Sequence, residues 1–183
     1  MIGQIKQLEM NDFEEMFEIW VQGTQEAFSN EGLDVAEKRD FHRTFFANAL
    51  ERQDRNFKIW GYVQDGELLG WQSLLPCQSA PAVWTKFAES STYVKPGKRG
   101  SGIGAKLLVH AIREARHHSE IAYIMGFVSD DNTHVEKLIA EVGFVKVGVL
   151  PKSPKDTVIG ERNQWSASDS SSLVRVSVWV VPL

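Results

Sequence analysis

The chain begins with an alternation of polar and apolar residues that passes into a helical pattern. Gln4 to Leu8 alternates as a short strand does, and apolar residues then recur at the spacing of an amphipathic helix. These apolar residues are Phe13, Met16, Phe17, Trp20 and Val21. Asn11, with Glu14 three residues later, predicts a capping box at the start of the helix. The N-terminal pattern therefore predicts a strand and a helix with one buried face.

Strands begin near residue 57. Before them, Val35 to Arg52 is a second helical stretch, with Phe41, Phe45, Phe46 and Leu50 as its apolar residues. Two strands, Phe57 to Val63 and Glu67 to Leu75, flank Asp65-Gly66. This dipeptide is a strong signal for the tight turn of a β-hairpin. The pattern therefore predicts antiparallel strands after the two helices.

The rest of the chain alternates strands with helices. Further strands are predicted at Ala88 to Val94, Tyr123 to Val128, Phe144 to Leu150 and Val174 to Val181. Further helices are predicted at Ile103 to His118 and at Thr133 to Val142, the second one ended by Gly143. The resulting order of elements predicts an α/β fold built around a mixed sheet.

Composition and charge indicate one folded domain. The 183 residues are 43% hydrophobic and 24% charged, close to globular averages, so residues 1–183 are predicted to form a single domain. A net charge of -4 argues against a chain-wide surface for nucleic acid. Cys77 is the one cysteine, which excludes an intramolecular disulfide and fits a reducing compartment. The histidines lack metal-ligand spacing, so no metal is expected.

Location and assembly are further expectations. Met1 to Leu8 has no signal-peptide pattern, and no stretch approaches the roughly 18 apolar residues of a membrane span. We therefore expect a cytoplasmic protein that binds no membrane. The last predicted strand, Val174 to Val181, is expected to be an apolar exposed edge, which favours a homodimer. Residues 152–172 lack periodicity and are expected to form a mobile arm.

A glycine-rich segment between the strand at Ala88 and the helix at Ile103 predicts an anion site. Its glycines let the backbone turn tightly and bring N–H groups to a ligand where a helix begins; they are Gly97, Gly100, Gly102 and Gly104. The same stretch contains no acid and four cations, which are Lys95, Lys98, Arg99 and Lys106. It matches neither G-x-x-x-x-G-K-[ST] nor G-x-G-x-x-G, so nucleotide hydrolysis and dinucleotide binding lose support.

The segment Arg99-x-x-Gly102-x-Gly104 resembles the acyl-CoA pyrophosphate loop of the GNAT N-acetyltransferase superfamily. Flanking residues are similar to those of its phosphinothricin acetyltransferase branch; they are Ala88-Glu89, Tyr93-Val94, Pro96, Asn132 and Gly143-Phe144. The resemblance extends from about Gln4 to Leu150. It implies a central, mostly antiparallel sheet with flanking helices, a V-shaped splay of strands at the acyl-CoA site, acetyl-CoA as co-substrate and a small-molecule amine as acceptor.

The resemblance also implies site residues. Thr92, Tyr93 and Val94 would offer backbone groups to the pantetheine arm, and Asn132 would bond the cofactor near its thioester. The pyrophosphate would lie against Arg99, Gly100, Ser101, Gly102, Ile103, Gly104 and Ala105. Trp84 is the candidate for a wall of the acceptor pocket, whereas core packing is the simpler interpretation of Trp60.

Glu89 is the candidate general base. It begins a polar segment in a strand that would normally be apolar on both faces, and a carboxylate in a partly dry cleft has a raised pKa. Such a carboxylate can take the proton from an amine that attacks the thioester directly. The plainer alternative for Glu89 is an ion pair with a nearby lysine.

The group that would protonate the departing thiolate is not assigned. Where the family often carries a tyrosine or histidine, this chain has Ile139, whose plain interpretation is core packing. Tyr93, His134 or a water molecule are alternatives. Two other functions stay open: a catalytically silent acyl-CoA sensor, and an acetyltransferase acting on proteins.

Overall fold

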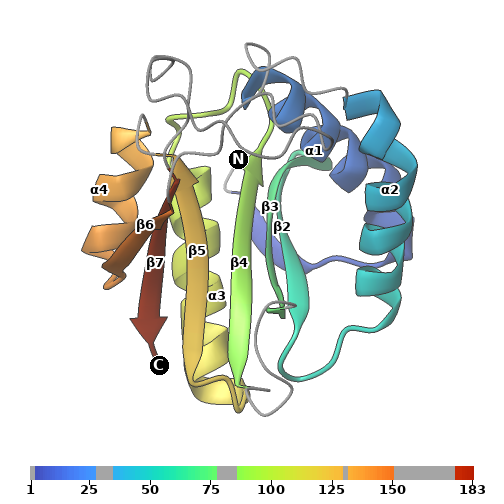
Figure 1. Ribbon diagram of the computed structural model, residues 1–183. Helices are drawn as coiled ribbons and strands as arrows, with labels where there is room; N and C mark the ends of the chain where they lie inside the picture. Colours follow the sequence, from blue (N-terminus) through green and yellow to red (C-terminus); the bar gives the residue numbers. More distant parts are fainter. Residues whose placement is uncertain (1–2, 28–34, 78–85, 130–131, 151–175) are drawn as a thin grey trace, which may run out of the picture. The chain divides into compact units, whose positions relative to one another are not determined.

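The computed structural model describes residues 3–27, 35–77, 86–129, 132–150 and 176–183 (Figure 1). Within these ranges the chain forms seven strands and four α-helices in the predicted order. The predicted α/β fold with mostly antiparallel strands is therefore confirmed. Two predictions, the arm at residues 152–172 and the pocket wall at Trp84, lie outside the described residues.

Two compact units make up the chain. The first is Met1–Ile124 with Pro182–Leu183, and the second is Met125–Val181. Each is described below by itself. The single domain and the V-shaped splay of strands remain predictions.

The first unit contains four antiparallel strands in chain order: β1 (Gln4–Gln7), β2 (Lys58–Gln64), β3 (Glu67–Pro76) and β4 (Phe87–Val94). Its α-helices are α1 (Phe13–Ala27), α2 (Val35–Glu51) and α3 (Ile103–His118). Asp65 and Gly66 join β2 to β3 with φ angles of 56° and 82°. Positive φ at both central residues is what a type I′ hairpin turn requires, so the hairpin prediction is confirmed.

Helices cover both faces of β3. Trp71 is fully buried on the face of α1, and its indole N–H donates to the carbonyl oxygen of Met16 at 2.9 Å. Trp60 is buried on the opposite face, where its ring lies 5.7 Å from that of His110 in α3, which confirms core packing for Trp60. Figure 1 shows α3 running behind β4. The apolar stripe of α3 is buried as predicted; it comprises Leu107, Leu108, Ala111, Ile112 and Ala115.

The predicted capping box of the first helix was wrong. The backbone N–H of Glu9 donates to the carboxylate of Asp12 at 3.0 Å, so the polar start lies at Glu9 and not at Asn11. A 3-10 turn, η1 (Met10–Asp12), follows it and leads into α1. Asp12 is the third residue after Glu9, the position from which a capping-box side chain reaches back to the N-cap N–H.

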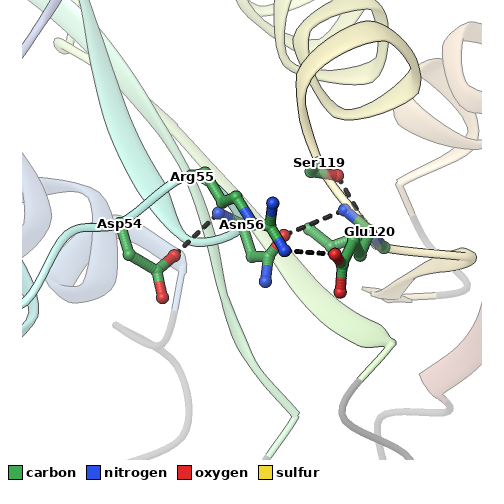
Figure 2. A network of polar contacts seen from close by, with 6 residues as sticks. Asp54, Arg55, Asn56, Ser119 and Glu120 are labelled. Atoms are coloured by element: carbon green, nitrogen blue, oxygen red, sulfur yellow. Dashed lines mark hydrogen bonds and ion pairs between the residues drawn. The ribbon is translucent and has the colours of Figure 1, made fainter.

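A polar network fastens the end of α3 to the segment before β2 (Figure 2). The Asn56 side-chain oxygen accepts from the backbone N–H of Glu120 at 2.9 Å, and Arg55 pairs with the Glu120 carboxylate. Asp54 accepts from the backbone N–H groups of Asn56 and Phe57, which closes the turn. The network fixes where α3 ends in the first unit.

The second unit contains α4 (Thr133–Glu141), β6 (Val145–Leu150), most of β5 (Tyr123–Ser129) and most of β7 (Val176–Pro182). The strand order is β5-β7-β6, so the expectation that the last strand forms an exposed edge was wrong. The Ser177 hydroxyl of β7 donates to the Val128 carbonyl of β5, and β7 also pairs with β6. The edge is β6, which exposes Val145, Val147 and Val149.

Candidate functional site

The glycine-rich loop leaves an open helix N-terminus. Gly97, Gly100 and Gly102 have φ angles of 79°, 77° and 80°, and no atom lies within 4 Å of a Cβ added to any of them. Gly102 is the N-cap of α3, and within the described chain no side chain caps this end. The first bond along the helix is Lys106 N–H to Gly102 O at 3.1 Å. The N–H groups of residues 103–105 therefore have no acceptor within the helix, and the helix dipole favours an anion there.

Two of the four cations near this loop are engaged elsewhere. Lys95 pairs with Glu67, and the Lys95 hydrogen bond and charge hold the pKa of the Glu67 carboxyl below its ordinary value. The Lys106 ammonium lies 5.4 Å from the centre of the Tyr62 ring. Lys98 and Arg99 are exposed. Both lie beside the open helix N-terminus and add positive charge at the loop.

The side chain of Arg99 extends toward α1. A Cβ added to Gly23, in the middle of α1, would lie 3.7 Å from Nη2 of Arg99 and 3.4 Å from Cδ1 of Tyr93. Both distances are ordinary van der Waals contacts, so α1 lies directly against Tyr93 of β4 and Arg99 of the loop. The helix that carries the core aromatic residues thus also borders the glycine-rich loop.

The pairing of β4 with β3 divides the backbone of β4 into two sets. Lys95 donates to the carbonyl of Leu69 at 2.9 Å, and Cys77 donates to that of Phe87 at 3.4 Å. Because hydrogen-bonded and non-hydrogen-bonded pairs alternate in an antiparallel ladder, the odd-numbered residues of β4 direct both backbone groups to β3. Tyr93 is thus paired with Trp71. Thr92 and Val94 direct their N–H and C=O groups to the opposite edge of β4.

Glu89 lies on β4 opposite Leu75, on the face of the sheet covered by α1. Its side chain is partly buried, and burial raises the pKa of its carboxyl above the ordinary value. Among the described residues no ion pair with Glu89 is found, so the alternative of a lysine partner gains no support there. A carboxylate of this kind is suited to accept a proton.

Tyr93 lies on the same face as Glu89. Burial raises the pKa of the Tyr93 phenol, a hydrogen bond with the Trp20 side chain lowers it, and the charge of Glu89 raises it further. An indole N–H can only donate, so the Tyr93 hydroxyl is the acceptor in this hydrogen bond. Its ring centre lies 4.6 Å from that of Trp71.

The second unit holds the remaining predicted residues. Asn132 is the N-cap of α4, and its side-chain oxygen accepts from the backbone N–H of Val135 at 3.2 Å. The amide NH₂ of Asn132 takes no part in this capping hydrogen bond. Ile139 is buried, which confirms core packing as its interpretation, and His134 is exposed.

Sequence reasoning missed two polar residues beside the candidate site, Gln72 and Trp20. Gln72 is fully buried on β3 and bonds the side chains of Ser90 and Thr92 on β4. The available signal was a glutamine in an otherwise apolar strand, where each buried amide needs partners. Trp20 fitted the apolar stripe of α1, so nothing in the pattern indicated its bond to Tyr93.

Two absences hold for the described residues. No group of three or more His, Cys, Asp or Glu side chains is placed to hold a metal ion. No helix in these ranges has both the length and the apolar character needed to cross a bilayer.

An uncapped helix N-terminus after a glycine loop, beside a strand that carries a partly buried carboxylate, is an arrangement that suits an anionic ligand and a proton transfer. The family model described as "Acetyltransferase (GNAT) family" matches residues 13–144. The chain therefore belongs to the GNAT acetyltransferase family, whose co-substrate is acetyl-CoA.

One curated relative matches about half of the chain. Over 88 residues the chain is 33% identical to a Bacillus subtilis protein named "Putative phosphinothricin acetyltransferase YwnH", a match covering 48% of this chain and 53% of that protein. The chain thus spans about half the length of this curated relative.

Solved structures share the fold. A phosphinothricin acetyltransferase from Sinorhizobium meliloti in complex with AcCoA superposes with a TM-score of 0.71 at 14% identity, covering 100% of this chain and 89% of that one. A ribosomal-protein-alanine N-acetyltransferase from Brucella melitensis gives 0.70 at 19% identity, covering 98% and 99%.

Proposed function

We propose that this acetyltransferase transfers the acetyl group of acetyl-CoA to the amine of a small molecule, with Glu89 as the general base. The observation that carries the proposal is a partly buried Glu89, without an ion pair in the described chain, on the strand whose even-numbered residues direct their backbone N–H groups away from β3. The curated relative, named a phosphinothricin acetyltransferase, supports a small acceptor.

The residues of the loop and of β4 would hold acetyl-CoA. The N–H groups at the start of α3 suit the pyrophosphate, with Lys98 and Arg99 adding positive charge. The outward backbone groups of Thr92 and Val94 suit the pantetheine arm and the thioester carbonyl. The Asn132 amide NH₂ is proposed as a further donor to the cofactor.

The main chemical obstacle of the reaction is that the amine is protonated at neutral pH, and Glu89 is the proposed proton acceptor. An aliphatic amine has a pKa of about 10, so about one molecule in a thousand has a free lone pair at neutral pH. The Glu89 carboxylate takes the amine proton, directly or through water, and the neutral amine then attacks the thioester carbon. The C–N bond forms as the C–S bond breaks, the nitrogen loses its second proton to water, and the sulfur leaves as a thiolate.

A free thiol has a pKa near 8.5, so the departing thiolate is a moderately weak base. It can leave without a proton, or it can take one from a nearby donor. Tyr93 is a candidate donor in the first unit, since burial raises the pKa of its phenol and so keeps the hydroxyl protonated. Ile139 has no proton to give. His134 and water are the remaining candidates.

Two alternative functions are each favoured by one observation. The apolar Ile139 at the family's acid position favours an acyl-CoA sensor without turnover. The likeness to a ribosomal-protein-alanine N-acetyltransferase favours a protein acceptor, although at 19% identity it concerns the fold alone.

Location and assembly belong to the same proposal. The free, buried thiol of Cys77 suits the reducing cytoplasm. The exposed valines of the edge strand β6 suit a homodimer, because apolar edges are usually covered. Sedimentation velocity of the wild type and of Val147→Lys tests the dimer.

The function is tested by calorimetry with acetyl-CoA, followed by thiol release across a panel of amines and N-terminal peptides. Binding with release on small amines, lost in Glu89→Gln and kept in Glu51→Gln, supports the proposal. Binding without release on any acceptor would favour the sensor, and release on peptides alone would favour the protein acetyltransferase.

A further inference from the structure

Gln72 is a polar side chain in the most buried part of the first unit. It lies at the middle of β3, is 0% exposed, and shares the face of α3 with Trp60, its partner on β2. Its neighbours on this face of β3 are Gly70 and Leu74. Burying an amide is unfavourable unless all its polar atoms find partners, and an apolar residue of similar size avoids that requirement.

Every polar atom of the Gln72 amide is bonded. Nε2 donates to the Ser90 hydroxyl oxygen and to the Ser73 carbonyl oxygen, each at 2.8 Å. Oε1 accepts from the Thr92 hydroxyl. Two of these three partners are alternate side chains of β4, so one amide spans the strand from Ser90 to Thr92.

Ser90 and Thr92 belong to the even-numbered set of β4, whose backbone groups point away from β3. On the inner side, the ladder bonds of residues 89, 91 and 93 hold the strand to β3. Gln72 adds two side-chain bonds to the residues whose backbone lies at the outer edge. A Cβ added to Gly104 would lie 3.7 Å from Cγ2 of Thr92, so the start of α3 packs on the same side chain.

We propose that Gln72 is a positioning residue for the pantetheine and thioester end of acetyl-CoA. It acts through Thr92 and Ser90, by holding the outer edge of β4 where its backbone groups meet the cofactor. The inference rests on the proposed function. It assigns Gln72 a role at the thioester end and none at the pyrophosphate loop, because its bonds reach β4 and not residues 97–102.

This difference between the two ends of the cofactor gives the test. Gln72→Met removes both side-chain bonds at similar volume, and Thr92→Val, at an exposed position, removes one of them without opening the core. Calorimetry is run with acetyl-CoA and with adenosine 3′,5′-bisphosphate, which lacks the pantetheine arm. We expect Gln72→Met to weaken acetyl-CoA binding about tenfold, the loss of about one to two hydrogen bonds, and nucleotide binding less than twofold.

The controls separate positioning from folding. Gln64→Met makes the same substitution at a partly exposed glutamine of β2 and is expected to bind both ligands as the wild type does. Thr92→Val is expected to weaken acetyl-CoA binding less than Gln72→Met, and the double variant no more than Gln72→Met alone, since both remove the same bridge.

Each outcome decides the matter. Unchanged acetyl-CoA affinity in Gln72→Met and Thr92→Val, or an equal loss for both ligands, would overturn the inference. If Gln72→Met fails to fold, Thr92→Val alone decides by the same two affinities. A wild type that binds neither ligand would instead overturn the proposed function itself.

Discussion

The carboxyl group of Glu89 and the phenol of Tyr93 lie four residues apart on one face of β4, and the charge of Glu89 adds to the burial that raises the pKa of Tyr93. Burial raises the pKa of Glu89 as well. Both shifts favour the protonated form, so the Glu89 carboxyl holds a proton more readily and the Tyr93 phenol gives one up less readily than usual. Under the proposed function, Glu89 is the proton acceptor and Tyr93 a candidate proton donor in acetyl transfer to an amine.

Replacing Glu89 with Gln is expected to lower kcat by about 10²–10⁴-fold, the usual contribution of a general base, with acetyl-CoA affinity unchanged. The wild-type kcat/KM should rise with pH along a limb centred above the ordinary glutamate pKa of about 4.3, because burial raises the pKa of Glu89. Steady-state kinetics from pH 5 to 9 checks both points. The same profile and rate in Glu89→Gln would show that another group is the base.

Stability should respond to the same carboxyl. Because the folded pKa of Glu89 lies above the unfolded one, the folded state binds the proton more tightly, and stability falls as pH rises between the two values. Glu89→Gln lacks this loss, so at pH 7 it should be more stable than the wild type, by less than about 1 kcal/mol because the side chain keeps contact with water. Urea unfolding at pH 7 and at pH 4 measures the difference, which should vanish at the lower pH.

The conformation of Gly102 should matter more than the space around it. Its φ angle is 80° and an added Cβ meets no atom within 4 Å, so a larger residue is penalised by its backbone conformation. Gly102→Val is expected to cost about 1–2 kcal/mol of stability and to weaken acetyl-CoA binding, whereas Gly102→Asn, which tolerates positive φ, should cost less. Unfolding and calorimetry on both variants provide the check, and equal costs would contradict it.

Gly23 offers a contrasting case, because an added methyl group has room. The distances of 3.4 Å to Tyr93 and 3.7 Å to Arg99 are ordinary contacts. Gly23→Ala should stabilise the protein by up to about 1 kcal/mol through helix propensity, while Gly23→Leu should displace both neighbours, lose stability and weaken acetyl-CoA binding. Chemical denaturation of the pair of variants tests this, and a destabilised Gly23→Ala would refute the contact geometry.

In the network of Figure 2, the hydrogen bond of Asn56 should contribute more stability than the ion pair between Arg55 and Glu120. Arg55 and Glu120 have side chains 66% and 60% exposed, so Arg55→Ala is expected to cost less than about 0.5 kcal/mol. Asn56→Ala removes the acceptor of the Glu120 N–H and should cost about 1 kcal/mol. Thermal unfolding of each variant gives the comparison, and the reverse order would contradict it.

Local signals predicted much of this fold. Asp65-Gly66 specified the hairpin because a two-residue turn needs positive φ at both positions. The helix Ile103–His118 was predicted with its bounds, since a glycine loop precedes it and its apolar stripe is regular. The same residues predict an anion site at the start of that helix, which stays a prediction.

Features that depend on tertiary pairing could not be predicted in this way. Position in a sheet is not encoded in one strand, so the alternation of β7 suggested an edge although β6 covers it. The division of β4 into residues that bond β3 and residues that face outward depends on register. The role of Gln72 depends on which side chains of β4 lie opposite it. The capping box begins at Glu9, two residues before the predicted Asn11.

The alternation along β4 has a consequence for how this enzyme can change over time. Even-numbered residues give their backbone to the proposed cofactor edge, while odd-numbered ones such as Glu89 and Tyr93 give their side chains to the face of α1. Substitutions at odd positions alter that face but leave the cofactor-binding backbone in place. Under the proposed function, acceptor preference would therefore change along this strand with little effect on acetyl-CoA binding.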